Sequence, residues 1–198
     1  NKIITNVSQI ERKYSTPLCL GYFNSFYYPP TPSNIQFRLI IPEGDEETGL
    51  NLTSWLRIVS EFMNYLGIEL RYKIINIIYY KDAEISESIL NNIIISKLYE
   101  PKGNGYFKNV DSLQNFITLA HELIHLTLPE EISEDIIDIV EGFIQFLAIE
   151  LLEYIFGSTY SKELVYSSYF ITLNNYRESE NELALIRYRK YPLVFRYI

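Results

Sequence analysis

The stretch Leu119-Ala120-His121-Glu122-Leu123-Ile124-His125-Leu126 contains both histidines of the 198-residue chain and arranges them as HExxH. Residues four apart lie on one face of an α-helix, so His121 and His125 can offer two imidazoles to one zinc ion. Glu122 then lies beside the metal as a candidate general base. A random chain of this composition would contain the pattern roughly 0.002 times per sequence, so chance explains it poorly. The stretch therefore predicts a helix that carries a metal centre.

A catalytic zinc site usually has three protein ligands and an open fourth position, so HExxH needs one more donor. No histidine remains, and Cys19 is remote in the sequence. The candidates are the carboxylates that follow the motif: Glu130, Glu131, Glu134, Asp138 and Glu141. The third ligand is thus expected to be an acid.

Helix geometry narrows these candidates. If a second helix begins at Ser133 and returns antiparallel to the first, it reaches the depth of the histidines after about three to seven residues, at a rise of about 1.5 Å each. This favours Asp138 or Glu141 over Glu134. Glu141 also lies in an apolar stretch, where a carboxylate is costly unless it is paired or bound to a metal. We expect Glu141 as the ligand; the alternatives are a buried ion pair at Glu141, or Asp138 as the ligand instead.

Composition limits the classes of partner. The net charge is −8 and the basic residues are scattered, which argues against a nucleic-acid partner. Cys19 is the single cysteine, so no internal disulfide forms and the sequence leaves a cytoplasmic or a secreted location open. No apolar run has the length of a membrane span. Because the sequence begins at Asn1, we expect the natural chain to extend further upstream.

Short runs of β-branched and apolar residues predict strands in the first half of the chain. Leu18 to Phe23 and Ile35 to Ile41 have this composition, and Lys73 to Tyr80 is expected to be a buried strand. A further strand is expected at Ile93 to Lys97, at the edge of the sheet, where a substrate strand could pair. These runs predict a small sheet.

Helices are predicted around and after these strands. Acidic Asp45-Glu46-Glu47 is expected to be a solvated loop before an amphipathic helix from Leu50 to Leu66. A turn is expected at Pro101 to Gly105, and Asp111 with Gln114 resembles the capping box of the motif helix.

The last third of the chain is expected to be helical. Ser133 resembles the N-cap of a long helix that runs to about Ile155 and is broken at Gly157-Ser158. Two more helices are expected over Lys162 to Asn174 and Glu180 to Ile198. The predicted fold is therefore α+β, with a small mixed β-sheet packed on the active-site helix. We expect a single domain, 1–198, with a β-containing lobe (1–110), a helical lobe (111–198) and the active site between them.

The motif and its surroundings resemble the gluzincin metallopeptidases, especially the aminopeptidase N-like group. His121 to His125 followed by Val140 to Leu147 is similar to the HExxH and NEGFAxYL-type segments of that group, whose glutamate is the third zinc ligand. Tyr188 to Arg196 resembles its YEKGAxVxR segment, in which the tyrosine stabilises the transition state. The resemblance covers about Leu50 to Ile198. It implies a zincin-like fold, with Tyr188 as a catalytic residue beside Glu122.

Two features depart from that pattern. Only 15 residues (141 − 125 − 1) separate His125 from Glu141, a shorter spacer than in the aminopeptidases. The group's GxMEN segment, which supplies a glutamate for the free amine of the substrate, should precede the strand at Ile93 to Lys97. The chain has Ser88-Ile89-Leu90-Asn91-Asn92 there. The resemblance therefore implies an endopeptidase or a non-standard aminopeptidase.

The sequence thus predicts a zinc metallopeptidase with one zinc ion per chain and a peptide or protein as substrate. His121, His125 and Glu141 are the expected metal ligands, and Glu122 activates the water that attacks the peptide bond. The alternative is a catalytically inactive domain that binds zinc or another protein. A structural zinc site would need a fourth protein ligand, and no further histidine or cysteine lies nearby, which favours catalysis.

Overall fold

Five strands form one mixed sheet in the computed structural model, which describes residues 23–80, 86–96, 106–128, 132–133, 135–175 and 182–198. They are β1 (Phe23–Tyr27), β2 (Gln36–Pro42), β3 (Ile74–Tyr79), β4 (Glu87–Ile89) and β5 (Asn92–Ile95), in the spatial order β1-β2-β3-β5-β4. The pairs β2–β3 and β3–β5 are parallel, whereas β1 and β4 pair antiparallel at the two edges. The prediction of a small mixed sheet in an α+β fold is confirmed.

The strands alternate between buried and partly exposed side chains. In β2, Phe37, Leu39 and Ile41 are buried, and in β3 Ile75 and Ile77 are buried. Successive side chains of a strand point to opposite faces of the sheet, so this period of two places one face of each strand in the core. The sheet is therefore packed against helices on that face.

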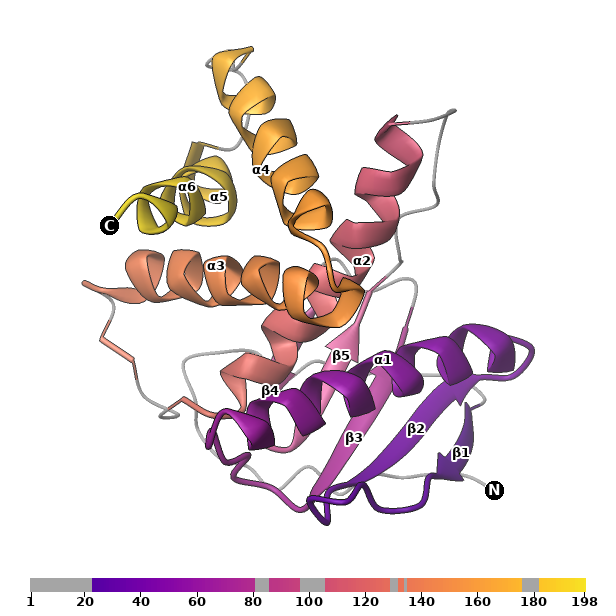
Figure 1. Cartoon of the computed structure of the whole chain (residues 1–198). Coiled ribbons are helices and arrows are strands. Elements are labelled where there is room, and N and C mark those ends of the chain that lie inside the picture. Colours follow the sequence, from indigo (N-terminus) through magenta and orange to yellow (C-terminus); the bar gives the residue numbers. More distant parts are fainter. Residues whose placement is uncertain (1–22, 81–85, 97–105, 129–131, 134, 176–181) are drawn as a thin grey trace.

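Two helices of similar length pack against the sheet and against each other. Helix α1 (Glu46–Tyr65) contacts β2, and helix α2 (Tyr106–His125) contacts β4 and β5 (Figure 1). Apolar side chains at three- and four-residue spacing, such as Leu52, Leu56 and Val59 of α1, form the buried face. The C-terminal half of α2, which carries the motif, is thus held in the core beside the edge strand β4.

Helices follow α2 to the end of the chain. They are α3 (Ile137–Phe156), α4 (Thr159–Asn174), α5 (Glu182–Leu185), the π-helical segment η1 (Ile186–Lys190) and α6 (Tyr191–Arg196). Helix α3 crosses α2 and also contacts α4, η1 and α6 (Figure 1). One cluster of buried side chains joins the sheet with α1, α2, α3 and α4. Among the described residues, none of these helices combines the length and the apolar character of a membrane span.

Two predictions about the first half of the chain are wrong. The acidic residues Glu46 and Glu47 begin α1 instead of forming a loop, with Asp45 at the N-cap position. Negative charge is favourable in the first turn of a helix, which accounts for acids there. The edge of the sheet is β4 and not Ile93 to Lys97, because Ser88 of β4 pairs with Ile93 and covers the outer side of β5.

Two predicted helix starts are also wrong. Helix α2 begins at Tyr106, before Asp111, so Asp111 is an interior position and not a cap. Helix α3 has Ile136 at its N-cap. Ser133 precedes the helix, in a turn where its carbonyl accepts a hydrogen bond from the Ile136 N–H. The end of α3 is confirmed: Gly157 adopts a left-handed conformation with φ 62°. The turn predicted at Pro101 to Gly105 lies outside the described residues.

The strand expected at Leu18 to Phe23 falls almost entirely outside the described residues; within them, β1 begins at Phe23.

Candidate metal centre

Helix α2 places both histidines of the chain on one face, one turn apart. The Nε2 atoms of His121 and His125 are 3.0 Å apart, and the ring centroids are 4.7 Å apart. His121 is buried, whereas His125 is partly exposed. The i, i+4 spacing of the motif therefore produces the convergence of two imidazoles that the sequence predicts.

Helix α3 brings the carboxylate of Glu141 to the same point. Its Oε2 lies 3.1 Å from His121 Nε2, and its Oε1 lies 3.3 Å from His125 Nε2. His121, His125 and Glu141 are the group among the described residues whose side-chain donor atoms could hold one metal ion. The structure thus brings together the three residues that the sequence predicts as ligands.

The spacing of these donor atoms fits a metal ion. Tetrahedral zinc with bonds of about 2.0–2.1 Å keeps neighbouring ligand atoms about 3.3 Å apart. His121 Nε2 lies 3.0 Å from His125 Nε2 and 3.1 Å from Glu141 Oε2, and the other carboxylate oxygen, Glu141 Oε1, lies 3.3 Å from His125 Nε2. Two imidazole nitrogens and one carboxylate oxygen are also a donor set found in catalytic zinc sites. The group can therefore hold a metal ion with little rearrangement of its side chains.

The charges of the group depend on one another. Burial raises the pKa of Glu141, but the hydrogen bonds with His121 and His125 outweigh this effect and hold that pKa well below its usual range. Burial lowers the pKa of His125, but the Glu141 carboxylate reverses this, and the net pKa of His125 is raised. Glu141 is therefore ionised and attracts positive charge to the position between the three side chains.

One ring nitrogen of this group has no hydrogen-bond partner within the part of the chain that the structure describes. His121 Nδ1 is buried and makes no hydrogen bond with the described residues. Histidine ligands usually donate from their second nitrogen to a carboxylate or carbonyl, which fixes the ring. Packing around the buried His121 and the contacts of its Nε2 atom must therefore hold the ring here.

Glu122 lies next to the ligands but outside their group. Its side chain is buried, with 6% of the residue surface exposed. Burial raises the pKa of Glu122 above its usual range; His121 and His125 act in the opposite direction. The Ser88 side chain on β4 also lowers this pKa, an influence that the sequence does not predict. The side chain is thus available for proton transfer and does not occupy a ligand position.

The C-terminal segment places Tyr188 against the group formed by His121, His125 and Glu141. The Tyr188 hydroxyl donates to Glu141 Oε2 over 3.3 Å, and its ring centroid lies 5.7 Å from that of His121. Burial and the neighbouring carboxylates raise the pKa of Tyr188, so the hydroxyl keeps its proton at neutral pH. Tyr188 belongs to the π-helical segment η1, a conformation that is often found at functional sites.

Two further contacts join this segment to α3. Asp138 forms an ion pair with Arg187, so its carboxylate is engaged away from the histidine group. A Cβ atom at Gly142 would lie 2.3 Å from Tyr191 Cβ and 3.2 Å from the Arg187 carbonyl oxygen. A glycine directly after Glu141 is needed for this close approach, a requirement that the sequence alone does not reveal. Together these contacts hold η1 against α3 at the level of the metal centre.

We expect Gly142→Ala to lower the free energy of unfolding by about 1–3 kcal/mol, because the added methyl group overpacks the contact with Tyr191. The change should be measured by denaturant unfolding. Ile139→Ala, on an exposed part of the same helix, serves as the control and should change stability by less than about 0.5 kcal/mol. A gain in stability for Gly142→Ala, as at an unhindered helical glycine, would contradict the close packing.

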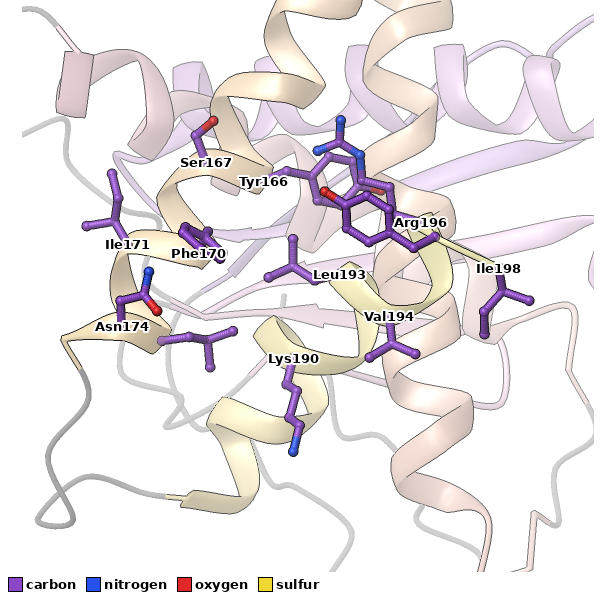
Figure 2. Close-up of a pocket in the computed structure, with 12 residues that line it drawn as sticks. Tyr166, Ser167, Phe170, Ile171, Asn174, Lys190, Leu193, Val194, Arg196 and Ile198 are labelled. Atoms are coloured by element: carbon purple, nitrogen blue, oxygen red, sulfur yellow. The ribbon is translucent and has the colours of Figure 1, made fainter.

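A groove of about 860 Å³ lies elsewhere, between α4 and the η1–α6 segment (Figure 2). Its lining includes the apolar side chains of Phe170, Leu193 and Val194 and the cation Lys190. None of the residues of the metal centre lines it. The groove is therefore separate from the metal centre.

Comparison with known proteins adds no assignment: no protein-family model matches the chain, and no curated protein matches it significantly in sequence.

Proposed function

We propose that this protein is a zinc-dependent peptidase of the gluzincin type that hydrolyses peptide bonds. The observation that carries the proposal is the convergence of His121, His125 and Glu141, with Glu122 buried beside them. The three proposed ligands, His121, His125 and Glu141, come from two helices, and their donor atoms lie within 4.8 Å of one another. Metal ligation by this group explains why a carboxylate and two imidazoles lie so close together in a largely enclosed position.

The donor set favours a catalytic centre over a structural one. Structural zinc sites are closed by four protein ligands, whereas catalytic sites have three and leave one position for water or substrate. Among the described residues, no fourth histidine, cysteine or acid joins the group. When bound there, the metal supplies Lewis-acid chemistry, which lowers the pKa of water and polarises a carbonyl group.

Glu122 performs the proton transfer in this proposal. Its carboxylate accepts a proton from the attacking water and passes it to the amine of the leaving product. The burial of Glu122 supports this role, because it raises the pKa of the carboxyl towards neutral pH. A group that acts first as base and then as acid is most effective when its pKa lies near the working pH. Glu122 follows His121 directly on α2, so the base lies between the two histidine ligands on the same helix.

Tyr188 stabilises the charge that develops on the substrate. A tyrosine whose pKa is raised remains a hydrogen-bond donor, and a fixed donor is most effective where negative charge appears in the transition state. The Tyr188 hydroxyl lies beside Glu141, at the rim of the group of ligands. The order of the functional residues along the chain, HExxH and then Glu141 and Tyr188, supports the resemblance to gluzincins.

The position of β4 supports a zincin-like architecture and an extended peptide as substrate. This strand forms the edge of the sheet and contacts α2, the helix that carries the motif. An exposed strand edge can pair with an extended peptide through main-chain hydrogen bonds. We therefore propose that the substrate strand pairs with β4. The sequence predicts this pairing at Ile93 to Lys97, but β4 is the strand at that edge of the sheet.

The test uses the zinc-loaded protein and a mixed peptide library in which half of the peptides have an acetylated N-terminus. Mass spectrometry identifies the cleaved bonds. We expect cleavage of internal bonds in both halves, and loss of cleavage after treatment with a chelator. Binding of zinc without any cleavage would contradict the proposal and favour the alternative, an inactive zinc-binding or protein-interaction domain.

A further inference from the structure

The π-helical segment η1 carries an arginine on each side of Tyr188 in the sequence. Arg187 forms an ion pair with Asp138 of α3, from its Nε to the carboxylate Oδ1. The guanidinium of Arg189 lies over the ring of Tyr169 of α4, 4.6 Å from the ring centroid, a cation–π contact. The two neighbours of Tyr188 are therefore attached to two different helices.

Both attachment points are fixed to the helices that carry the candidate metal ligands. Tyr169 is buried, and its hydroxyl accepts a hydrogen bond from Gln145 Nε2 over 2.9 Å and donates one to Gln114 Oε1 over 3.0 Å. Gln145 belongs to α3 and Gln114 to α2. Asp138 lies one turn before Glu141 on α3. The two arginines thus connect η1 to the same helices that bring the histidines and the carboxylate together.

The Tyr188 hydroxyl has no short contact of its own that holds it in place. Its hydrogen bond to Glu141 Oε2 is 3.3 Å long, whereas O–H···O bonds are usually about 2.5–3.0 Å. The Tyr188 ring lies near that of His121, with 5.7 Å between the centroids, but the two residues belong to different segments of the chain. The place of the hydroxyl therefore depends on how η1 is attached to its neighbours.

We propose that Arg187, through its ion pair with Asp138, is a positioning residue that keeps the Tyr188 hydroxyl at the candidate metal ligands. The contact of Arg189 with Tyr169 supports η1 from the second helix. This inference rests on the proposed role of Tyr188 as a hydrogen-bond donor to the substrate.

The ion pair should matter more for the reaction than for the fold. The Arg187 and Asp138 side chains are 26% and 36% exposed, and ion pairs near the surface contribute little to stability. A displaced catalytic group has a much larger effect, since an error of about 1 Å can lower the rate by about 100-fold. Loss of the pair is therefore expected to change turnover while the protein remains folded.

The test combines Arg187→Gln with Tyr188→Phe in the zinc-loaded protein. We expect Tyr188→Phe to lower kcat by about 10²- to 10³-fold, as for the loss of a transition-state donor, and Arg187→Gln to lower it by about 10-fold or more. Zinc affinity should stay within a few-fold of the parent in both. Adding Arg187→Gln to Tyr188→Phe should lower kcat no further, because the donor is already absent. An equal loss from Arg187→Gln in both backgrounds would overturn the positioning role.

The matched control is Arg196→Gln. Arg196 of α6 has a similar exposure, 27% of its side chain, and is also paired with a carboxylate, that of Glu163 on α4. Both variants remove one partly exposed ion pair of the C-terminal segment, so their denaturant midpoints should be similar. We expect Arg196→Gln to keep the kcat of the parent. A loss of kcat as large as that of Arg187→Gln would contradict a specific role for the pair with Asp138.

A second measurement does not depend on turnover. NMR of zinc-loaded protein, protonated only at His and Tyr side chains, should show a nuclear Overhauser cross-peak between the rings of His121 and Tyr188, which Tyr188→Phe removes and so assigns. We expect Arg187→Gln, or Asp138→Asn if that variant does not fold, to weaken the cross-peak and Arg196→Gln to preserve it. An unchanged cross-peak would overturn the positioning role even if the parent cleaves peptides. A weakened cross-peak in a protein whose parent cleaves nothing would reject the peptidase proposal and support the dependence of Tyr188 on this ion pair.

Discussion

Replacing Glu122 by Gln is expected to abolish measurable peptide cleavage while the protein keeps its metal. The substitution preserves size and the ability to accept a hydrogen bond, but an amide cannot accept a proton from water. Loss of a general base typically lowers kcat by about 10²- to 10⁴-fold. Because Glu122 lies outside the group of ligands, its replacement should leave zinc affinity close to that of the parent. Turnover of the peptide identified in the library and zinc content should be measured on the same preparation.

The control for this variant is His121→Ala, which removes a proposed ligand and should lose zinc and activity together. Glu122→Gln and His121→Ala therefore separate the chemical step from metal binding. Cleavage by Glu122→Gln at the rate of the parent would contradict the mechanism. Loss of zinc by Glu122→Gln would show that this residue supports the site itself.

Glu141→Ala is expected to weaken zinc binding by more than about 100-fold, because even the loss of a partner that only orients a ligand lowers affinity by about 10- to 100-fold. The Nε2 atoms of His121 and His125 lie 3.0 Å apart. The substitution removes the carboxylate whose two oxygens lie 3.1 and 3.3 Å from them. Competition with a chromogenic chelator measures the affinity.

Asp138→Ala is the matched comparison, since it removes a carboxylate one turn earlier on α3. Asp138 is paired with Arg187, so its loss should change zinc affinity only a few-fold through the position of η1. A larger loss of affinity for Asp138→Ala than for Glu141→Ala would make Asp138 the third ligand, the alternative that the sequence leaves open.

Much of the fold could be predicted because its pattern is local. Ile35 to Ile41 and Lys73 to Tyr80 correspond closely to β2 and β3, where the composition favours strands. Leu50 to Leu66 lies within or next to α1, since its apolar residues repeat at helical spacing. Gly157 stops α3 because its left-handed backbone conformation suits glycine.

The ends of helices and the edge of the sheet could not be predicted in the same way. Asp111 and Ser133 are residue types that often cap helices, but α2 begins earlier and α3 later, because packing determines how far each helix extends. The edge strand β4, Glu87–Ile89, is too short to show a pattern in the sequence. Its place beside β5 depends on a turn and on pairing that composition does not specify.

The candidate metal site could likewise be predicted only in part. His121 and His125 could be paired from their spacing alone, and Glu141 followed from the depth of α3 and the cost of burying a carboxylate. Tyr188 was predicted only through the resemblance, because η1 is distant in sequence from α2. The role of Gly142 was not predicted, since it depends on a contact between segments that are far apart in the chain.

His121, His125 and Glu141 are proposed to bind one catalytic zinc ion. The most direct test is elemental analysis of the purified protein after exposure to zinc and removal of excess metal, with a triple variant that replaces the three residues by Ala as the blank. We expect about one zinc per chain in the parent and none in the variant, from the three-ligand geometry. An equal zinc content in both proteins, or no zinc in either, would contradict the account.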